Sequence, residues 1–254
     1  MVALMSEKQR RFRQEYQAQI HPLYNGIVHI GVMYGVGISA IAYFVSRMDH
    51  ATWEWLLVIP VFILSNLFEW WIHKNVMHRL VDVWALRAIY DRHTRQHHQY
   101  FTNNVMTVDS TREFRIIFFP WRALFSFMLL SAPFAVLAGW LINPNAGWVL
   151  MCTTVGQYLI YETFHYCCHV HENGFVRHCP FVNTIRRHHT SHHNQGIMMN
   201  INMNLTFPIA DWLMGTSDLK RGLLGHLFNG YDERHVKPEL RAAKDKQSLR
   251  EAAA

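Results

Sequence analysis

Histidines are the residues of this chain whose type and spacing are most able to do chemistry. Ten of the 18 fall in four groups at metal-ligand spacing: His73/His78, His93/His97/His98, His165/His169 and His189/His192/His193. Neutral imidazole is the commonest side-chain metal ligand near neutral pH, and it binds iron, copper and zinc. Ten imidazoles exceed what one ion can hold, so we expect two metal ions. The groups lie beyond apolar stretches long enough to cross a bilayer, which indicates a metal-dependent oxygenase at a membrane surface.

The spacing within the groups predicts which imidazoles share a site. Residues four apart lie on one face of an α-helix. This spacing joins three pairs: His93/His97, His165/His169 and His189/His193. His73 and His78 are five apart, about 140° around an ideal helix, so both reach one ion only at a helix end or a local distortion.

For other histidines and for acidic residues near the four histidine groups, the sequence leaves more than one role possible. His188 stands four before His192 and could replace His189 as a ligand, although His189 gives three ligands on a tighter face. The remaining histidines are expected to be surface or hydrogen-bonded side chains: His21, His29, His50, His171, His178, His226 and His235. Four acidic residues are candidates for hydrogen bonds that fix imidazole tautomers: Glu69, Asp91, Glu162 and Asp211. Ordinary salt bridges to Arg87 or Arg92 are the alternative role for such carboxylates.

Four apolar windows are candidates for transmembrane helices, since a bilayer core needs roughly 20 mainly apolar helical residues. They are residues 27–46, 53–72, 123–142 and 146–164. The first contains glycines that allow close helix approach, and the second ends in tryptophans typical of the membrane interface. The alternative, an all-α soluble protein with four buried helices, fits the one-sided charge pattern less well.

The joints RMDHAT and NPNAG are so short that the windows must form two helical hairpins. Of the 24 Lys and Arg residues, only Arg47 lies in these joints. The positive-inside rule therefore predicts that both termini and all four histidine groups lie in the cytoplasm. This distribution of Lys and Arg fits a bacterial inner membrane and an endoplasmic reticulum membrane equally, so it does not distinguish between them.

We therefore expect an all-α integral membrane protein of 254 residues with a single domain. It has four transmembrane helices in two hairpins, and a cytoplasmic histidine-rich helical cap that holds a dimetal site. Residues 1–26 form an N-terminal cytoplasmic or interfacial helical segment, 73–122 and 165–235 form the cap, and 236–254 form a solvated C-terminal tail.

Charge and cysteine content exclude several other classes. The net charge of +6 comes from residues that flank the apolar spans, and no basic motif with interleaved aromatics is present. This favours anionic membrane lipids over nucleic acid as the partner. The four cysteines lack the spacing of a zinc ribbon or a disulfide framework, which favours a reducing compartment. Cys168 beside His169 is interpreted as a buried apolar thiol rather than a ligand.

Five segments of the chain resemble motifs of the fatty acid hydroxylase and sterol desaturase superfamily, and are closest to those of fatty acid 2-hydroxylases. The four histidine boxes are EWWIHKNVMH (69–78), HTRQHH (93–98), YETFHYCCH (161–169) and HHTSHH (188–193). The element DWLMGT (211–216) resembles one that closes many members of the superfamily. The likeness covers about residues 65–216.

The resemblance implies a function and a set of ligands. All ten grouped histidines would bind two metal ions, which are iron in the superfamily and which zinc can replace during purification. The reaction would be a dioxygen-dependent hydroxylation of a lipid or fatty acyl C–H bond, with no catalytic side chain beyond the metal ligands. Electrons would come from a separate protein, a b-type cytochrome or a ferredoxin with its reductase, because HPLY (21–24) lacks the glycines of a heme-binding loop.

Two features depart from the pattern of the family. Three residues separate His93 from His97 where 2-hydroxylases usually have two, and Cys167 and Cys168 stand where aromatic or aliphatic residues are usual. The first departure predicts a different local geometry in the second box.

Three alternative functions share part of this pattern. A desaturase, or a hydroxylase of sterol or carotenoid rings, would have the same histidine boxes, because substrate position decides which hydrogen is taken. A non-enzymatic metal carrier or sensor would need polar residues along its spans, whereas only His29 lies within one. A structural scaffold would tolerate loss of any histidine group.

Overall fold

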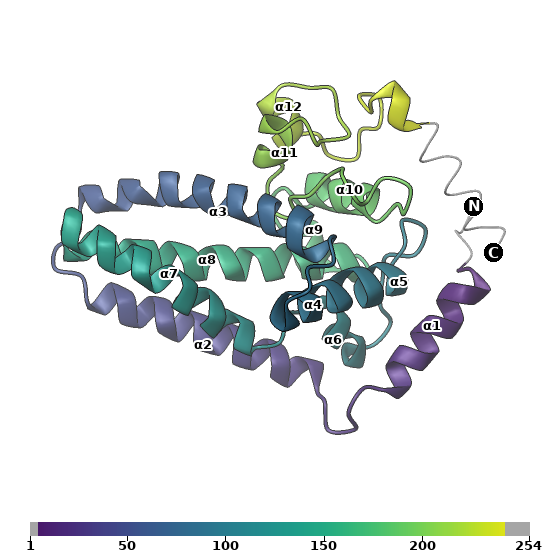
Figure 1. Ribbon diagram of the computed structural model, residues 1–254, viewed down its shortest axis with the longest axis horizontal. Coiled ribbons are helices and arrows are strands. Elements are labelled where there is room, and N and C mark those ends of the chain that lie inside the picture. The colour runs from purple at the N-terminus through teal and green to yellow at the C-terminus, as the bar shows by residue number, and fades with distance from the viewer. Residues whose placement is uncertain (1–4, 242–254) are drawn as a thin grey trace. The chain divides into compact units, whose positions relative to one another are not determined.

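The computed structural model describes residues 5–241, and this part of the chain is helical with no β-strand (Figure 1). The all-α prediction is therefore confirmed. The longer elements are α1 (Glu7–Ala18), α2 (Gly26–Ser46), α3 (Val58–Ile72), α7 (Arg122–Leu141), α8 (Pro144–His169) and α10 (Val182–His192). The shorter ones are η1 (Trp53–Leu57), η2 (His73–Met77), α4 (Trp84–Tyr90), η3 (Asp91–His97), α5 (His98–Tyr100), η4 (Thr111–Glu113), α6 (Phe114–Ile117), α9 (Gly174–His178), α11 (Ile209–Leu213) and α12 (Leu223–Leu227).

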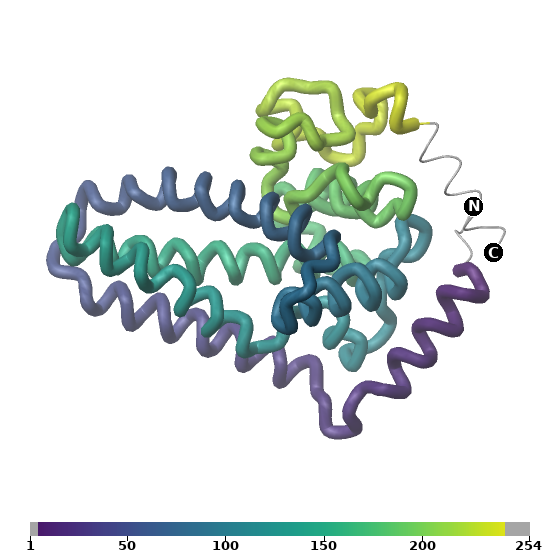
Figure 2. Tube along the Cα trace, in the orientation of Figure 1, coloured from purple at the N-terminus to yellow at the C-terminus, as the bar shows by residue number. Residues whose placement is uncertain are grey.

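The N-terminal helix is present as predicted, since Ser6 caps α1 by accepting a hydrogen bond from the backbone N–H of Gln9 at 3.2 Å. Of the expected N-terminal segment and C-terminal tail, residues 1–4 and 242–254 lie outside the described part. Figure 2 follows the path of the chain between these limits.

Within residues 5–241, three helical stretches are long and apolar enough to cross a membrane: Gly26–Ser46, Trp53–Met77 and Thr111–Leu141. They cover three of the four predicted windows, apart from Ile142 at the end of the third. The fourth window, 146–164, lies in α8, which has the length of a span but interrupts its apolar sequence with Gln157 and Glu162. Four spans are thus not confirmed, and the fourth remains a prediction.

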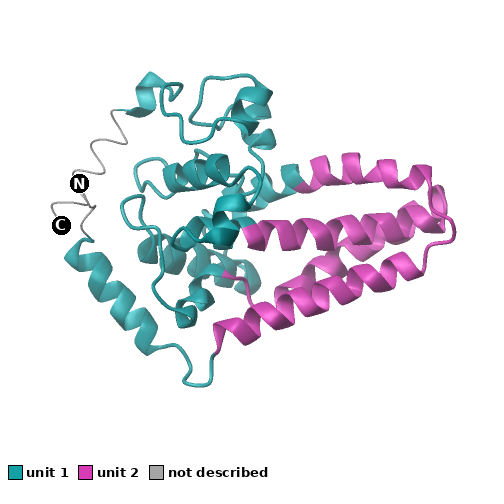
Figure 3. Cartoon of the chain, turned by 180° about the vertical axis from the view of Figure 1, so that it is seen from behind, with its two compact units in different colours: residues 1–24, 66–117, 164–254 teal, residues 25–65, 118–163 magenta. Residues whose placement is uncertain are grey.

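The chain divides into two compact units (Figure 3). Unit 2 comprises residues 25–65 and 118–163 and holds most of the apolar helices. In it α2 approaches α8 closely, because a Cβ on Gly37 would meet the side chain of Leu159 at 2.9 Å. The Phe44 and Trp148 rings stack at 5.9 Å further along the same helix pair.

The two predicted hairpin joints contact each other within unit 2. The Asn145 side chain donates to the carbonyl of Asp49 at 2.7 Å and accepts from its backbone N–H at 3.0 Å. Asn143 donates to the carboxylate of Glu54 at 2.9 Å. Both joints therefore lie at one end of this unit, as expected for two helical hairpins that pack side by side.

Apolar side chains on the spans face outward. Leu129, Val136 and Trp140 on α7 are 76%, 73% and 79% exposed. Exposed apolar surface of this extent is stable against lipid and not against water. Together with the three spans, it defines a multi-pass membrane protein.

Unit 1 comprises residues 1–24, 66–117 and 164–254, and contains all ten grouped histidines. The buried Arg13 of α1 connects the N-terminal helix to the rest of this unit. Its guanidinium donates to the carbonyls of Tyr100 at 2.9 Å, Thr107 at 3.0 Å and Val105 at 3.2 Å. One side chain thus fixes three points of segment 100–107.

We predict that Gly147→Leu destabilises unit 2, since a Cβ at this position would lie 2.5 Å from the carbonyl oxygen of Ala135 on α7. Overpacking of this kind costs about 1–3 kcal/mol. Thermal unfolding in detergent is expected to shift to lower temperature. Gly156→Leu in the same helix is the matched control, because no atom lies within 4 Å of its Cβ position. Equal melting temperatures for the two variants would contradict the packing described.

Candidate metal centre

A π-helical turn brings the first histidine pair together. In η2 (His73–Met77) the backbone N–H of His78 donates to the carbonyl of His73 at 3.1 Å, an i to i+5 bond. The two rings consequently approach to 4.9 Å between centroids. The local distortion expected from their five-residue spacing is present.

A second π-helical segment reorganises the next group. In η3 (Asp91–His97) the backbone N–H of His98 donates to the carbonyl of His93, so these two residues share one face. His97 then lies on a different face. The expected pairing of His93 with His97 at one site is wrong for this reason.

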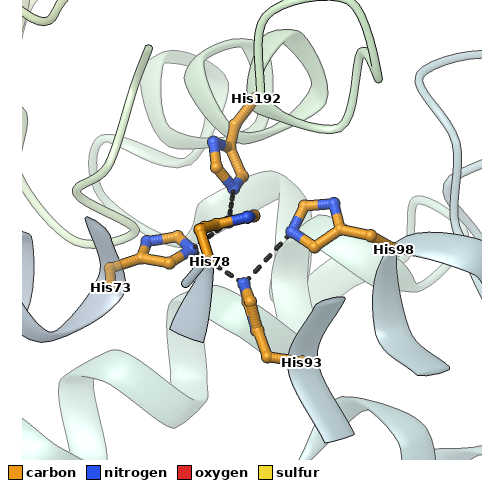
Figure 4. Close-up of side chains that lie close together, drawn as sticks. All are labelled: His73, His78, His93, His98 and His192. Carbon is orange, nitrogen blue, oxygen red and sulfur yellow. Dashed lines mark hydrogen bonds between the residues drawn. The ribbon is translucent and has the colours of Figure 1, made fainter. Parts of the chain in front are cut away.

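Five imidazoles form cluster A: His73, His78, His93, His98 and His192. Their ligand nitrogens lie within 4.8 Å of one another, and every ring is buried. Figure 4 shows the five rings converging from separate parts of the chain. The Nε2 of His73 lies 2.8 Å from that of His93, and the Nε2 of His78 lies 3.1 Å from that of His192.

Four further imidazoles form the core of cluster B: His97, His165, His169 and His189. His165 and His169 come from the last turns of α8, four residues apart as predicted. The Nε2 of His193 lies 3.0 Å from that of His189 and 3.2 Å from that of His97, so we include His193 in cluster B. Helix α10 thus supplies His189 to one cluster and His192 to the other.

Backbone carbonyls orient five of these rings. In each case the Nδ1–H donates to a carbonyl oxygen and Nε2 is left facing the cluster. The pairs are His73 with Met203, His97 with Ile116, His169 with Met106, His192 with Ile201 and His193 with Phe101. A carbonyl oxygen only accepts, so the proton of each neutral ring resides on Nδ1.

This arrangement leaves nitrogen lone pairs facing each other in a buried space. The Nε2 atoms of His97 and His193 are 3.2 Å apart, although both rings carry their proton on Nδ1. Neither atom can donate to the other, and His193 is fully buried. A cation between the two nitrogens removes the repulsion and satisfies both lone pairs.

Burial keeps these imidazoles in the neutral form that binds metal. It lowers the pKa of six rings outside the apolar spans well below the ordinary value of 6.5, and neighbouring imidazoles lower it further: His93, His97, His98, His189, His192 and His193. No carboxylate is part of either cluster. Both clusters are therefore all-nitrogen donor sets.

The distances fit metal coordination. Two nitrogens that are each about 2.1 Å from one ion, at a right angle, lie about 3.0 Å apart. The closest Nε2 contacts run from 2.8 to 3.3 Å. The clusters are also adjacent, since the rings of His98 in cluster A and His193 in cluster B are 4.3 Å apart. The residues present thus fit two neighbouring ions.

Two of the predicted carboxylates act on a loop and do not contact the ligands. Asp211 accepts from the backbone N–H groups of Met203 at 2.9 Å and Asn204 at 2.7 Å. Glu69 accepts from those of Leu205 at 2.6 Å and Thr206 at 2.9 Å. They hold segment 201–206, whose carbonyls orient one ring of η2 and one of α10 in cluster A.

His188 lies with this loop and not with the clusters, because its Nε2 donates to Asp211 at 3.0 Å. Burial favours the neutral form of Asp211, but the hydrogen bonds from His188 and Thr216 outweigh it and hold the carboxyl pKa below its ordinary value. The geometry thus favours His189 as the ligand.

The other two predicted carboxylates lie elsewhere. Asp91 pairs with Arg95 at 3.3 Å, and Glu162 accepts from the backbone N–H of Phe119 at 3.1 Å. Arg87 pairs with Asp82 at 2.6 Å, which is not one of the predicted carboxylates.

The backbone carbonyls that accept hydrogen bonds from the imidazoles, and the residues that place these carbonyls, were not predicted from the sequence. Carbonyls occur in every residue and leave no sequence signal. A buried ion pair on α10 was also missed: Arg187 donates to Asp218 at 2.7 and 2.8 Å, and Ser191 donates to the same carboxylate at 2.8 Å. The arginine beside HHTSHH was its only signal.

Comparison with known families assigns the chain to a class. The family model described as fatty acid hydroxylase matches residues 57–216, which include all ten grouped histidines and the element 211–216. The chain belongs to the fatty acid hydroxylase family. No curated protein and no solved structure matches it. It is thus a membrane protein of a lipid hydroxylase family, with two histidine clusters that could hold metal.

We predict that Asp211→Ala weakens metal binding in cluster A and leaves cluster B intact. Loss of the carboxylate releases the loop that orients rings of cluster A alone, and the loss of such an outer contact typically costs about 10- to 100-fold in affinity. Chelator competition on the folded protein measures both sites. Asp82→Ala, whose side chain is 90% exposed, is the control. An equal loss at both clusters would contradict the assignment.

We predict that the metal-free protein loses stability as the pH falls below 6.5. The folded-state pKa of the buried rings lies below 6.5, so the unfolded chain binds protons that the folded chain does not. Each such ring contributes up to about 1.4 kcal/mol per pH unit. Melting temperatures above and below pH 6.5 measure the effect, and the exposed His178→Ala variant should show the same slope. A melting temperature that rises as the pH falls would contradict the prediction.

Proposed function

We propose that the chain is a dimetal oxygenase that hydroxylates a C–H bond of a lipid or fatty acyl chain. The observation that carries the proposal is the pair of buried all-imidazole clusters, with lone pairs facing inward, in a chain of the fatty acid hydroxylase family. Cluster A and cluster B would each hold one ion, which we propose to be iron in the cell. Zinc accepts the same ligands and can replace it during purification.

The chain's own residues bind and orient in this proposal. Bound iron would supply the redox chemistry with dioxygen that hydroxylates an unactivated carbon. The imidazoles hold the ions, the backbone carbonyls fix the ring orientations, and burial of the ten rings excludes water. The proposal includes no catalytic side chain beyond the metal ligands.

The stoichiometry requires an electron donor. Conversion of R–H and dioxygen to R–OH and water consumes two electrons and two protons beyond those of the C–H bond. We propose that a separate b-type cytochrome, or a ferredoxin with its reductase, supplies the electrons. The substrate enters from the bilayer, and the one-sided distribution of Lys and Arg supports a cytoplasmic location for the clusters and both termini.

We predict that cells expressing the chain accumulate lipid heavier by one oxygen. Lipid mass spectrometry should detect this species, and fragmentation should locate the hydroxyl; the likeness to 2-hydroxylases makes carbon 2 of an acyl chain the first position to inspect. His169→Ala removes a ligand of cluster B and should abolish the product. His171→Ala, whose side chain is 66% exposed and pairs with Asp109, is the matched control and should retain it.

Other lipid products in this experiment would identify other reactions. A lipid lighter by two hydrogens would identify a desaturase, because loss of a second hydrogen replaces hydroxyl formation. Oxygen in a sterol or carotenoid would identify a ring hydroxylase. A product that persists in His169→Ala would contradict the role of cluster B.

A further inference from the structure

A group of large apolar side chains is exposed on unit 1, on the short helices α11 and α12, which pack on each other (Figure 1). We call it the α11–α12 surface: Trp212, Leu213, Met214, Leu224 and Phe228. Leu224 is 71% exposed and Phe228 is 67% exposed. Phe181 extends the surface, since its ring lies 5.4 Å from that of Phe228. Contiguous apolar surface of this kind marks an interaction site.

The charged side chains of residues 205–231 that reach solvent are basic, and the first exposed carboxylate after them, Glu233, pairs with Arg187 at 2.7 Å. Between Leu205 and Tyr231 the only carboxylates are Asp211 and Asp218, and both are fully buried. The basic groups of the same stretch, Lys220 and Arg221, reach solvent at least in part. An anionic partner is therefore favoured.

The α11–α12 surface is continuous with a membrane span. Asn66 of α3 donates to the carbonyl of Phe207 at 2.8 Å and accepts from the backbone N–H of Ala210 at 3.0 Å. Trp70 donates to the hydroxyl of Thr216 at 2.8 Å. Both α3 residues belong to the candidate span Trp53–Met77. The segment 207–216 is thus held against the end of a helix that lies in the bilayer.

We propose that the α11–α12 surface docks into the boundary between headgroups and acyl chains of a bilayer that contains anionic lipid. Its apolar side chains enter the boundary, about 5–10 Å deep, and Lys220 and Arg221 contact lipid phosphates and carboxylates. A second copy of the chain or a soluble partner would also cover apolar surface. Neither explains both the attachment to a span and the basic solvent-facing charges of residues 205–231 as well as the bilayer does.

The test measures the environment of single nitroxide labels on the full chain in vesicles of phosphatidylcholine with phosphatidylserine. Labels are attached at Leu213→Cys, Leu224→Cys and, as a control, Arg234→Cys, whose side chain is 86% exposed. The background is Cys179→Ser, because the other three cysteines are buried. Collisions with dioxygen report bilayer, and collisions with a water-soluble nickel chelate report water.

We expect dioxygen to dominate at the Leu213 and Leu224 positions and the nickel chelate to dominate at the Arg234 position. Lys220→Gln should lower the ratio of inserted to water-exposed label by about fivefold in the anionic vesicles. It should have no effect in vesicles of phosphatidylcholine alone. The readout needs no substrate or electron donor, so it is independent of the proposed reaction.

Two results would overturn the proposal. Nickel collisions at the Leu213 position equal to those at the Arg234 position would show that the surface lies in water. Shielding from both reagents would show that protein covers it, and loss of the shielding on dilution into excess lipid would identify a second copy as the cover.

Discussion

The repulsion between nitrogen lone pairs in a buried space is the interaction on which the rest of unit 1 depends. Burial holds the imidazoles neutral, and backbone carbonyls hold the proton of His97 and His193 on the far nitrogen. Their Nε2 atoms then face each other at 3.2 Å with no proton between them. In the proposed function, two metal ions would turn this unfavourable arrangement into a coordination cage, and metal binding would then be coupled to folding of the unit.

Hydrogen bonds outside the clusters fix two segments of unit 1, and each segment orients rings of one cluster. Asp211 and Glu69 fix segment 201–206, whose carbonyls orient rings of cluster A. Arg13 of the N-terminal helix fixes segment 100–107, and the carbonyls of Phe101 and Met106 orient rings of cluster B. The N-terminal helix, which the sequence predicted to be cytoplasmic or interfacial, therefore supports cluster B from outside.

Histidine spacing predicted which histidines lie together better than it predicted how they divide between cluster A and cluster B. Spacing of four correctly joined His165 to His169 on α8, and spacing of five correctly required a distortion at His73 and His78. The same rule failed at His93, because a π-helical segment puts His98 at i+5, and not His97 at i+4, on the face of His93. No residue type in the sequence predicts such a segment. Carbonyl orientation was equally unpredictable, since it depends on tertiary approach between distant segments.

The metal content of the purified, folded protein tests the central claim most directly. The account predicts two ions per chain, with nitrogen ligands in X-ray absorption. His78→Ala and His169→Ala should each lower the content to one, because they belong to different clusters, and the exposed His178→Ala should retain two. A folded wild-type protein that binds one ion or none, or variants that leave the content at two, would contradict the account.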